Sequence, residues 1–146
     1  MLDFSLVVDY LPFMIEATWV TLKISILSTA VGLVLGLVIA LLKISTISFL
    51  VHIANFYLWI IRGTPMLVQL FLIYYGLPQI GIELTPMAAA VVALGINSAA
   101  YIAEIYRGGI MSISKGQIEA AESLGMGYLL RMRKIVIVLL CIVYCT

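Results

Sequence analysis

The sequence predicts an all-α protein whose helices cross a membrane, and two observations carry that prediction. Of 146 residues, 64% are hydrophobic and only 10% are charged, whereas a soluble domain carries about 25% charged residues. The apolar residues also fall into long blocks without any charge, and helices satisfy their own backbone polar groups in lipid. The composition therefore excludes a soluble globular enzyme and a disordered protein. A formal net charge of +1 excludes a nucleic-acid binder.

Three charge-free blocks predict three full transmembrane helices. Each has 19 or 20 residues, which matches the roughly 20 residues needed to cross about 30 Å of hydrocarbon. We expect the spans at about 20–43, 52–78 and 84–106. A fourth apolar block, Ile135–Thr146, covers only about 18 Å as a helix, so it is an incomplete fourth span.

The first span carries small residues at every fourth position, namely Ser28, Gly32, Gly36 and Ala40. Small side chains at this spacing let two helix backbones approach closely in a membrane. The stripe predicts a packing surface rather than a chemical site.

The second span contains the sequence Arg62-Gly63-Thr64-Pro65 within a longer apolar stretch. Proline removes a helix hydrogen bond and clashes with the preceding turn. Two placements are open. In the first, Phe49–Ile61 lies at the inner membrane interface and Arg62 marks the entry of a span that begins at Gly63. In the second, one long kinked helix carries Arg62 into the bilayer, where it would need a partner.

The third span contains Asn97 near its middle and Glu104 near its inner end. Polar side chains in a span face protein or water rather than lipid. Asn97 is therefore either one half of an interhelical hydrogen bond or a residue that lines a pathway. Glu104 is expected at the interface, paired with Arg107 or Arg62.

The distribution of basic residues predicts the orientation, because Lys and Arg are enriched on the cytoplasmic side. With three spans, the amino terminus and the turn at residues 76–85 lie outside. Six of the eight basic residues then fall inside: Lys43, Arg107, Lys115, Arg131, Arg133 and Lys134.

The loop at residues 107–134 predicts a docking element. Gly116 breaks any long helix, residues 117–124 form a short helix, and Gly125 ends it in a left-handed conformation. Glu119 lies in the first turns, where the helix dipole favours a negative charge. A helix this short is unstable alone, and its small residues favour close contact with a groove on another protein.

This loop resembles the EAA loop of ABC importer permeases. The resemblance lies in Glu119-Ala120-Ala121, three residues, Gly125, nine residues and then Ile135. Further segments resemble the polar amino-acid branch of that family: Arg62-Gly63-Thr64-Pro65 with Val68-Gln69, Tyr101-Ile102-Ala103-Glu104, Arg107-Gly108-Gly109-Ile110 and Lys115-Gly116-Gln117. Residues 1–136 are accordingly expected to form a permease transmembrane domain.

The resemblance implies a bacterial inner-membrane permease subunit for amino-acid import, with a fold of the type I importer class. Its implied partners are a cytoplasmic ATPase subunit, a second permease subunit, an extracytoplasmic amino-acid-binding protein and membrane lipid. No nucleotide-cradling glycine loop with its Lys is present, so ATP hydrolysis belongs to the partner; the chain is not an enzyme and needs no cofactor or metal. Two residue sets follow. The residues implied to couple to the ATPase are Gly116, Glu119, Ala120, Ala121, Gly125 and Ile135. The residues implied to line the path or form its gate are Arg62, Thr64, Pro65, Gln69, Asn97 and Glu104.

The tail departs from the family pattern, and other functions stay open. Ile137-Val138 stands where the family continues with Leu-Pro, so residues 137–146 are expected to be off-pattern and the chain to be truncated and impaired in uptake. One alternative is a small ion-coupled transporter or channel that uses Glu104 and Arg62 as titrating or gating charges. Another is an inert membrane fragment. The transported amino acid is not determined.

Overall fold

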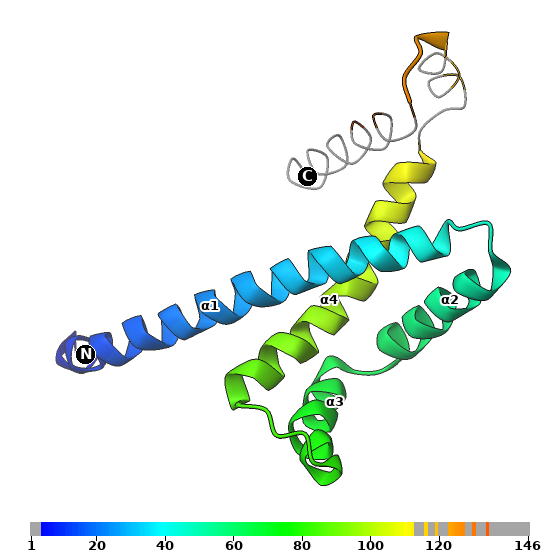
Figure 1. Cartoon of the computed structure of the whole chain (residues 1–146). Helices are drawn as coiled ribbons and strands as arrows, with labels where there is room; N and C mark the ends of the chain where they lie inside the picture. The colour runs from blue at the N-terminus through cyan, green and yellow to red at the C-terminus, as the bar shows by residue number, and fades with distance from the viewer. Residues whose placement is uncertain are drawn as a thin grey trace.

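A computed structural model describes residues 4–112, 116, 119, 123–127, 130 and 134. Throughout this part of the chain the regular structure is helical, with no strand, as the composition predicts. The elements in order are α1 (Phe4–Lys43), α2 (Ser48–Gly63), α3 (Met66–Phe71), the π-helix η1 (Leu72–Gly76), the 3-10 helix η2 (Leu77–Ile80) and α4 (Pro86–Met111). In Figure 1, α1 crosses α4, while α2 and α3 lie on the other side of α4 from the free end of α1.

The helix α1 is longer than the predicted first span. It begins at Phe4 rather than near residue 20 and runs without interruption to Lys43. Its apolar part from Tyr10 covers 34 residues, or about 51 Å, which exceeds the hydrocarbon thickness. The early turns extend away from the other helices (Figure 1), and Tyr10, Phe13 and Trp19 are exposed there.

The small-residue stripe of α1 packs against α4, which confirms it as a packing surface. A Cβ atom added at Gly36 would lie 2.8 Å from Cγ2 of Ile102, and one at Gly32 would lie 3.0 Å from Cβ of Ser98. Ser28 and Ala40 are buried. The α1–α4 contact is the largest between helices in the described part of the chain.

The second predicted span is interrupted. The helix α2 ends at Gly63, Thr64 and Pro65 have extended backbones, and helical structure resumes at Met66. The two segments, Ser48–Gly63 and Met66–Ile80, are bent by 104°. The alternative of one long kinked helix is therefore wrong, because Pro65 stands at a complete break.

The third predicted span, 84–106, corresponds to α4, displaced by a few residues. Thr85 caps the helix by accepting a hydrogen bond from the backbone N–H of Ala88 at 3.3 Å, and Pro86 occupies the first turn, where its missing N–H is harmless. By length and composition, α1 from Tyr10 and α4 are long enough to cross a membrane, and the bent pair adds a third crossing if it is one span.

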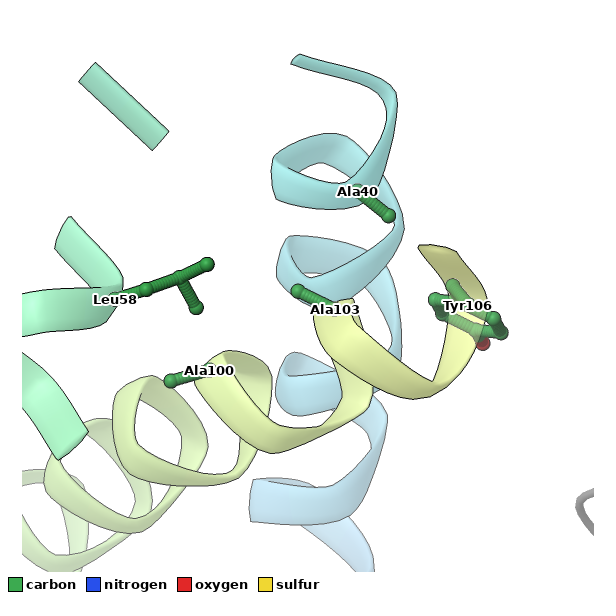
Figure 2. Close-up of a cluster of buried hydrophobic side chains, with 5 residues drawn as sticks. All are labelled: Ala40, Leu58, Ala100, Ala103 and Tyr106. Atoms are coloured by element: carbon green, nitrogen blue, oxygen red, sulfur yellow. The ribbon is translucent and has the colours of Figure 1, made fainter. Parts of the chain in front are cut away.

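The helices α1, α2 and α4 meet in a core of mostly small residues around Leu58 (Figure 2). Leu58 of α2 reaches toward Ala100 and Ala103 of α4, with Ala40 of α1 and Tyr106 completing the cluster. Alanine side chains at this point keep the helix axes close. Leu58 fills the space between them, and the partly buried Leu33, Leu37 and Ile102 pack against the cluster. This core fixes the position of α2 up to the break that follows it.

Candidate functional site

The break between α2 and α3 exposes backbone carbonyls that need partners. Gln69, in the first turns of α3, supplies the hydrogen-bond donors for these carbonyls. The two N–H donors of its Nε2 are shared among three acceptors: the carbonyl oxygen of Ile61 at 2.7 Å, Oγ1 of Thr64 at 2.8 Å and the carbonyl oxygen of Thr64 at 3.1 Å. The Thr64 hydroxyl donates in turn to the carbonyl of Ile60 at 2.9 Å. One side chain thereby spans the interruption and holds α2 and α3 together.

The same glutamine is joined to the third span. Nδ2 of Asn97 donates to Oε1 of Gln69 at 3.2 Å, linking α4 to α3. Both side chains are half-buried. This confirms the interhelical hydrogen bond as one of the two roles considered for Asn97, and it places Thr64, Gln69 and Asn97, all candidates from the sequence, in one polar network. Pro65 adjoins this network through its backbone.

A second polar link to α4, this one from α2, was not predicted from the sequence. The hydroxyl of Tyr57 donates to the carbonyl oxygen of Ile96 at 2.6 Å. Ile96 precedes Asn97, so both links reach α4 at the same level. A tyrosine inside an apolar helix indicates that its hydroxyl forms a hydrogen bond. The sequence does not indicate the acceptor, because here the acceptor is a backbone carbonyl.

Glu104 stands between two cations at the carboxyl end of α1 and α4. Its Oε1 is paired with Nζ of Lys43, and its Oε2 accepts from Nε of Arg107 at 2.9 Å. The predicted pairing of Glu104 with Arg107 is confirmed, and the alternative pairing of Glu104 with Arg62 is wrong. Lys43 takes that place because the crossing of α1 and α4 brings the end of α1 beside Glu104.

Arg62 instead lies over an aromatic ring. Its guanidinium carbon is 5.5 Å from the ring centroid of Tyr101 on α4, the geometry of a cation–π contact. Among the described residues it makes no hydrogen bond or ion pair beyond this contact. Arg62 is exposed and stands at the end of α2, beside the break but outside the Gln69 network.

The loop residues are described only in part. Gly116 and Glu119 are helical, and α4 has already ended at Met111, so the helix break precedes Gly116. Oγ of Ser123 donates to the carbonyl of Glu119 at 2.9 Å, and Gly125 has φ +72°, the left-handed ending that the sequence predicts. Gly116, Glu119 and Gly125 are exposed. Ala120, Ala121 and Ile135 lie outside the described residues, as does the tail at 137–146.

Long apolar helices and a polar network at a broken segment define a polytopic helical membrane protein. The family described as "Binding-protein-dependent transport system inner membrane component" matches residues 32–143, more than half of the chain. The chain belongs to this family, whose members are transport components rather than enzymes. The match extends past residue 136, where the sequence predicts the family pattern to end.

Curated relatives have similar sequences. The arginine transport system permease protein ArtQ of Bacillus subtilis is 50% identical over 87% of this chain and 58% of its own length. The putative glutamine transport system permease protein GlnP of Rickettsia typhi is 45% identical over 86% of this chain and 58% of its own. The chain thus spans about three fifths of the length of these relatives.

A solved structure shares the fold. The crystal structure of an amino acid ABC transporter with histidines has a TM-score of 0.79 and 47% sequence identity, covering 92% of this chain and 63% of the other. The arrangement of α1, α2, α3 and α4 is therefore that of a chain in such a transporter. Together with the family and the apolar helices, it establishes a membrane location.

Proposed function

We propose that this chain is a permease subunit of an ATP-driven amino-acid importer and that the broken segment lines its path. The observation that carries the proposal is the Gln69 network. Non-helical backbone at membrane depth is tolerated only where protein buries it or where it lines a water-filled cavity. Here one side chain satisfies the freed carbonyls of Ile61 and Thr64, and Asn97 fixes that side chain.

The network suits a path because its bonds are exchangeable. An amide side chain can release one acceptor and take another within the same site, including a polar group of a passing solute. The relatives named above are permease proteins for arginine and for glutamine. Both names support an amino acid as the solute, delivered by a binding protein, with a second permease subunit enclosing the path.

Coupling to a separate ATPase subunit is assigned to the short helix that ends at Gly125. Its exposed residues Gly116, Glu119 and Leu124 are available to a partner. The resemblance of Glu119-Ala120-Ala121 and Gly125 to the EAA loop supports this role, with Ile135 as the last member of the pattern. Movement of the partner would be transmitted through α4, which leads into the loop.

Uptake into vesicles tests the proposal. We would reconstitute the chain with an ABC ATPase subunit and an amino-acid-binding protein, and measure uptake of labelled arginine and glutamine with ATP, without ATP, and with a proton gradient alone. ATP-dependent uptake that Gln69→Leu abolishes supports the proposal, and it would contradict the impairment of uptake that the tail at residues 137–146 predicts. Gln79→Leu is the matched control, because within the described residues Gln79 bonds only to the carbonyl of Tyr75, at 3.4 Å.

The alternatives give different results in the same vesicles. Uptake driven by the proton gradient without ATP would favour an ion-coupled transporter that uses Glu104 and Arg62. Equal uptake by the Gln69→Leu variant and the unchanged chain would remove the broken segment from the path.

The orientation is part of the proposal, with the amino terminus and Pro78 outside and Lys43 and Lys115 inside. Single cysteines at positions 78 and 115 would be labelled with an impermeant reagent in intact cells. Labelling at 78 alone is expected, and strong labelling at 115 would reverse the assignment.

A further inference from the structure

An open groove lies between the end of α1, the last turns of α2 and the inner half of α4. Its charged and polar lining consists of Lys43, Asn55, Trp59, Arg62, Tyr101 and Glu104. The groove is distinct from the Gln69 network, which none of these side chains joins. Lys43 and Arg62, separated in sequence by α2, face the same space.

The charges around this groove do not balance. Among the described residues that line the groove, Glu104 is the one carboxylate, and it is already shared by Lys43 and Arg107. The guanidinium of Arg62 contacts only the ring of Tyr101 among the described residues. A guanidinium stacked on a ring keeps its N–H donors free at its edge. The positive charges of Lys43 and Arg62 therefore exceed the single negative charge of Glu104 in the groove, and an anion would complete the pairing of Arg62.

The surroundings of the groove indicate which anion. Trp59 lines the groove from α2, and Phe56 lies beside Trp59 with its ring centroid 6.3 Å away; the two are 74% and 62% exposed. Exposed aromatic side chains of this kind lie at the headgroup level of a membrane. Basic pockets between membrane helices bind anionic headgroups, and arginine binds phosphate oxygens through paired N–H donors.

We propose that this groove binds the phosphodiester of an anionic phospholipid. Arg62 donates to the phosphate, Lys43 adds a second positive charge, and Trp59 and Phe56 contact the lipid beside it. A free phosphate ion shares the first two interactions and gains nothing from the aromatic pair, so the lipid is the favoured source of the phosphate.

Tryptophan fluorescence tests this site directly, because the chain has two tryptophans. Trp19→Phe leaves Trp59 as the reporter. The protein would be placed in phosphatidylcholine bilayers containing a minor fraction of either brominated phosphatidylglycerol or brominated phosphatidylcholine. We expect brominated phosphatidylglycerol to quench Trp59 as if it were about fivefold enriched at the groove over brominated phosphatidylcholine. This is the effect of one basic residue near a membrane surface.

Variants of Arg62 and of its neighbour Glu104 separate binding from folding. Arg62→Gln should remove the preference, and Arg62→Lys should keep most of it. Lys23→Gln is the matched control, since Lys23 lies near the middle of α1, about 30 Å along the helix from Lys43 and the groove. Glu104→Gln should raise the preference, because it removes the carboxylate that competes with the phosphate.

Three results would overturn the proposal. The first is equal quenching by both brominated lipids. The second is a preference that Arg62→Gln leaves unchanged or that Glu104→Gln fails to raise. The third is loss of the preference when inorganic phosphate replaces chloride at constant ionic strength, which would assign the groove to free phosphate. The measurement needs neither ATP nor partner subunits, so its outcome is independent of the proposed transport.

Discussion

The two faces of α4 are held by different forces. Toward α1, the contact is made by small residues. A Cβ atom added at Gly36 would lie 2.8 Å from Ile102, and one added at Gly95 would lie 2.7 Å from Val31. Toward α2 and α3, it is made by one leucine and by hydrogen bonds from Tyr57 and Asn97. The first face is a close backbone approach, and the second is a set of polar links around a break.

This difference separates a fixed contact from an adjustable one. Apolar side chains gain nothing by leaving lipid for another helix, so association depends on tight packing or on hydrogen bonds. Tight packing has one good geometry, because a shift of an ångström loses the contact. Amide hydrogen bonds can be exchanged for others. We therefore expect α1 and α4 to move together and α3 to shift relative to them.

The largest expected effect comes from filling the α1–α4 contact. Gly36→Leu places a bulky side chain where a Cβ alone lies 2.8 Å from Cγ2 of Ile102 and 3.1 Å from the backbone oxygen of Ala99. We expect a loss of about 3 kcal/mol in unfolding free energy. The measurement is unfolding in mixed detergent micelles, followed by tryptophan fluorescence. Gly108→Leu in α4 is the control, since nothing lies within 4 Å of a Cβ there. Equal stability of both variants would contradict the close-approach account.

The next effect concerns the adjustable face. Gln69→Leu leaves the carbonyls of Ile61 and Thr64 without their donor, and we expect a loss of about 2 kcal/mol. A double-mutant cycle with Asn97→Leu, measured by the same unfolding, should give a coupling of about 1 kcal/mol. A coupling near zero would show that the bond between these two side chains contributes nothing to the α3–α4 contact.

A smaller effect is expected at the charged end of α1 and α4. Glu104→Gln removes the carboxylate shared by Lys43 and Arg107, and the side chain is partly exposed, so we expect a loss of about 1 kcal/mol. The loss should shrink at high salt. Glu83→Gln serves as the control, because Glu83 forms no ion pair within the described residues. Salt-independent loss would mean that packing, and not charge, is responsible.

The smallest effect on stability, and a large one on coupling, is expected in the loop. Gly125 has φ +72°, a conformation that valine adopts poorly. In the reconstituted complex, Gly125→Val should leave unfolding of the helices unchanged and reduce the stimulation of ATP hydrolysis by the permease. Gly127→Val is the matched control, since Gly127 is also exposed and has no positive φ. Equal stimulation of ATP hydrolysis by both variants would show that the left-handed conformation of Gly125 is not needed for the proposed coupling.

Much of the site was recognisable before any helix was placed. Thr64, Gln69 and Asn97 stand out as polar residues in apolar segments, and a polar group in lipid needs a partner. Their joint network was not predictable, because Gln69 and Asn97 are 28 residues apart and their contact depends on the 104° bend. Proline at position 65 signals an interruption, but its angle depends on what α2 and α3 pack against.

The amino-acid sequence alone predicts the apolar helices, the small-residue stripe of α1 and the left-handed glycine after the short loop helix. These features are local, since hydropathy, residue size and φ preference act within a few turns of chain. The tertiary structure decided that the stripe faces α4, that Lys43 and not Arg62 pairs with Glu104, and that Arg62 lies over Tyr101. Those pairings depend on where helices cross, and Lys43 and Glu104, 61 residues apart, meet only because small residues let α1 and α4 pack so closely.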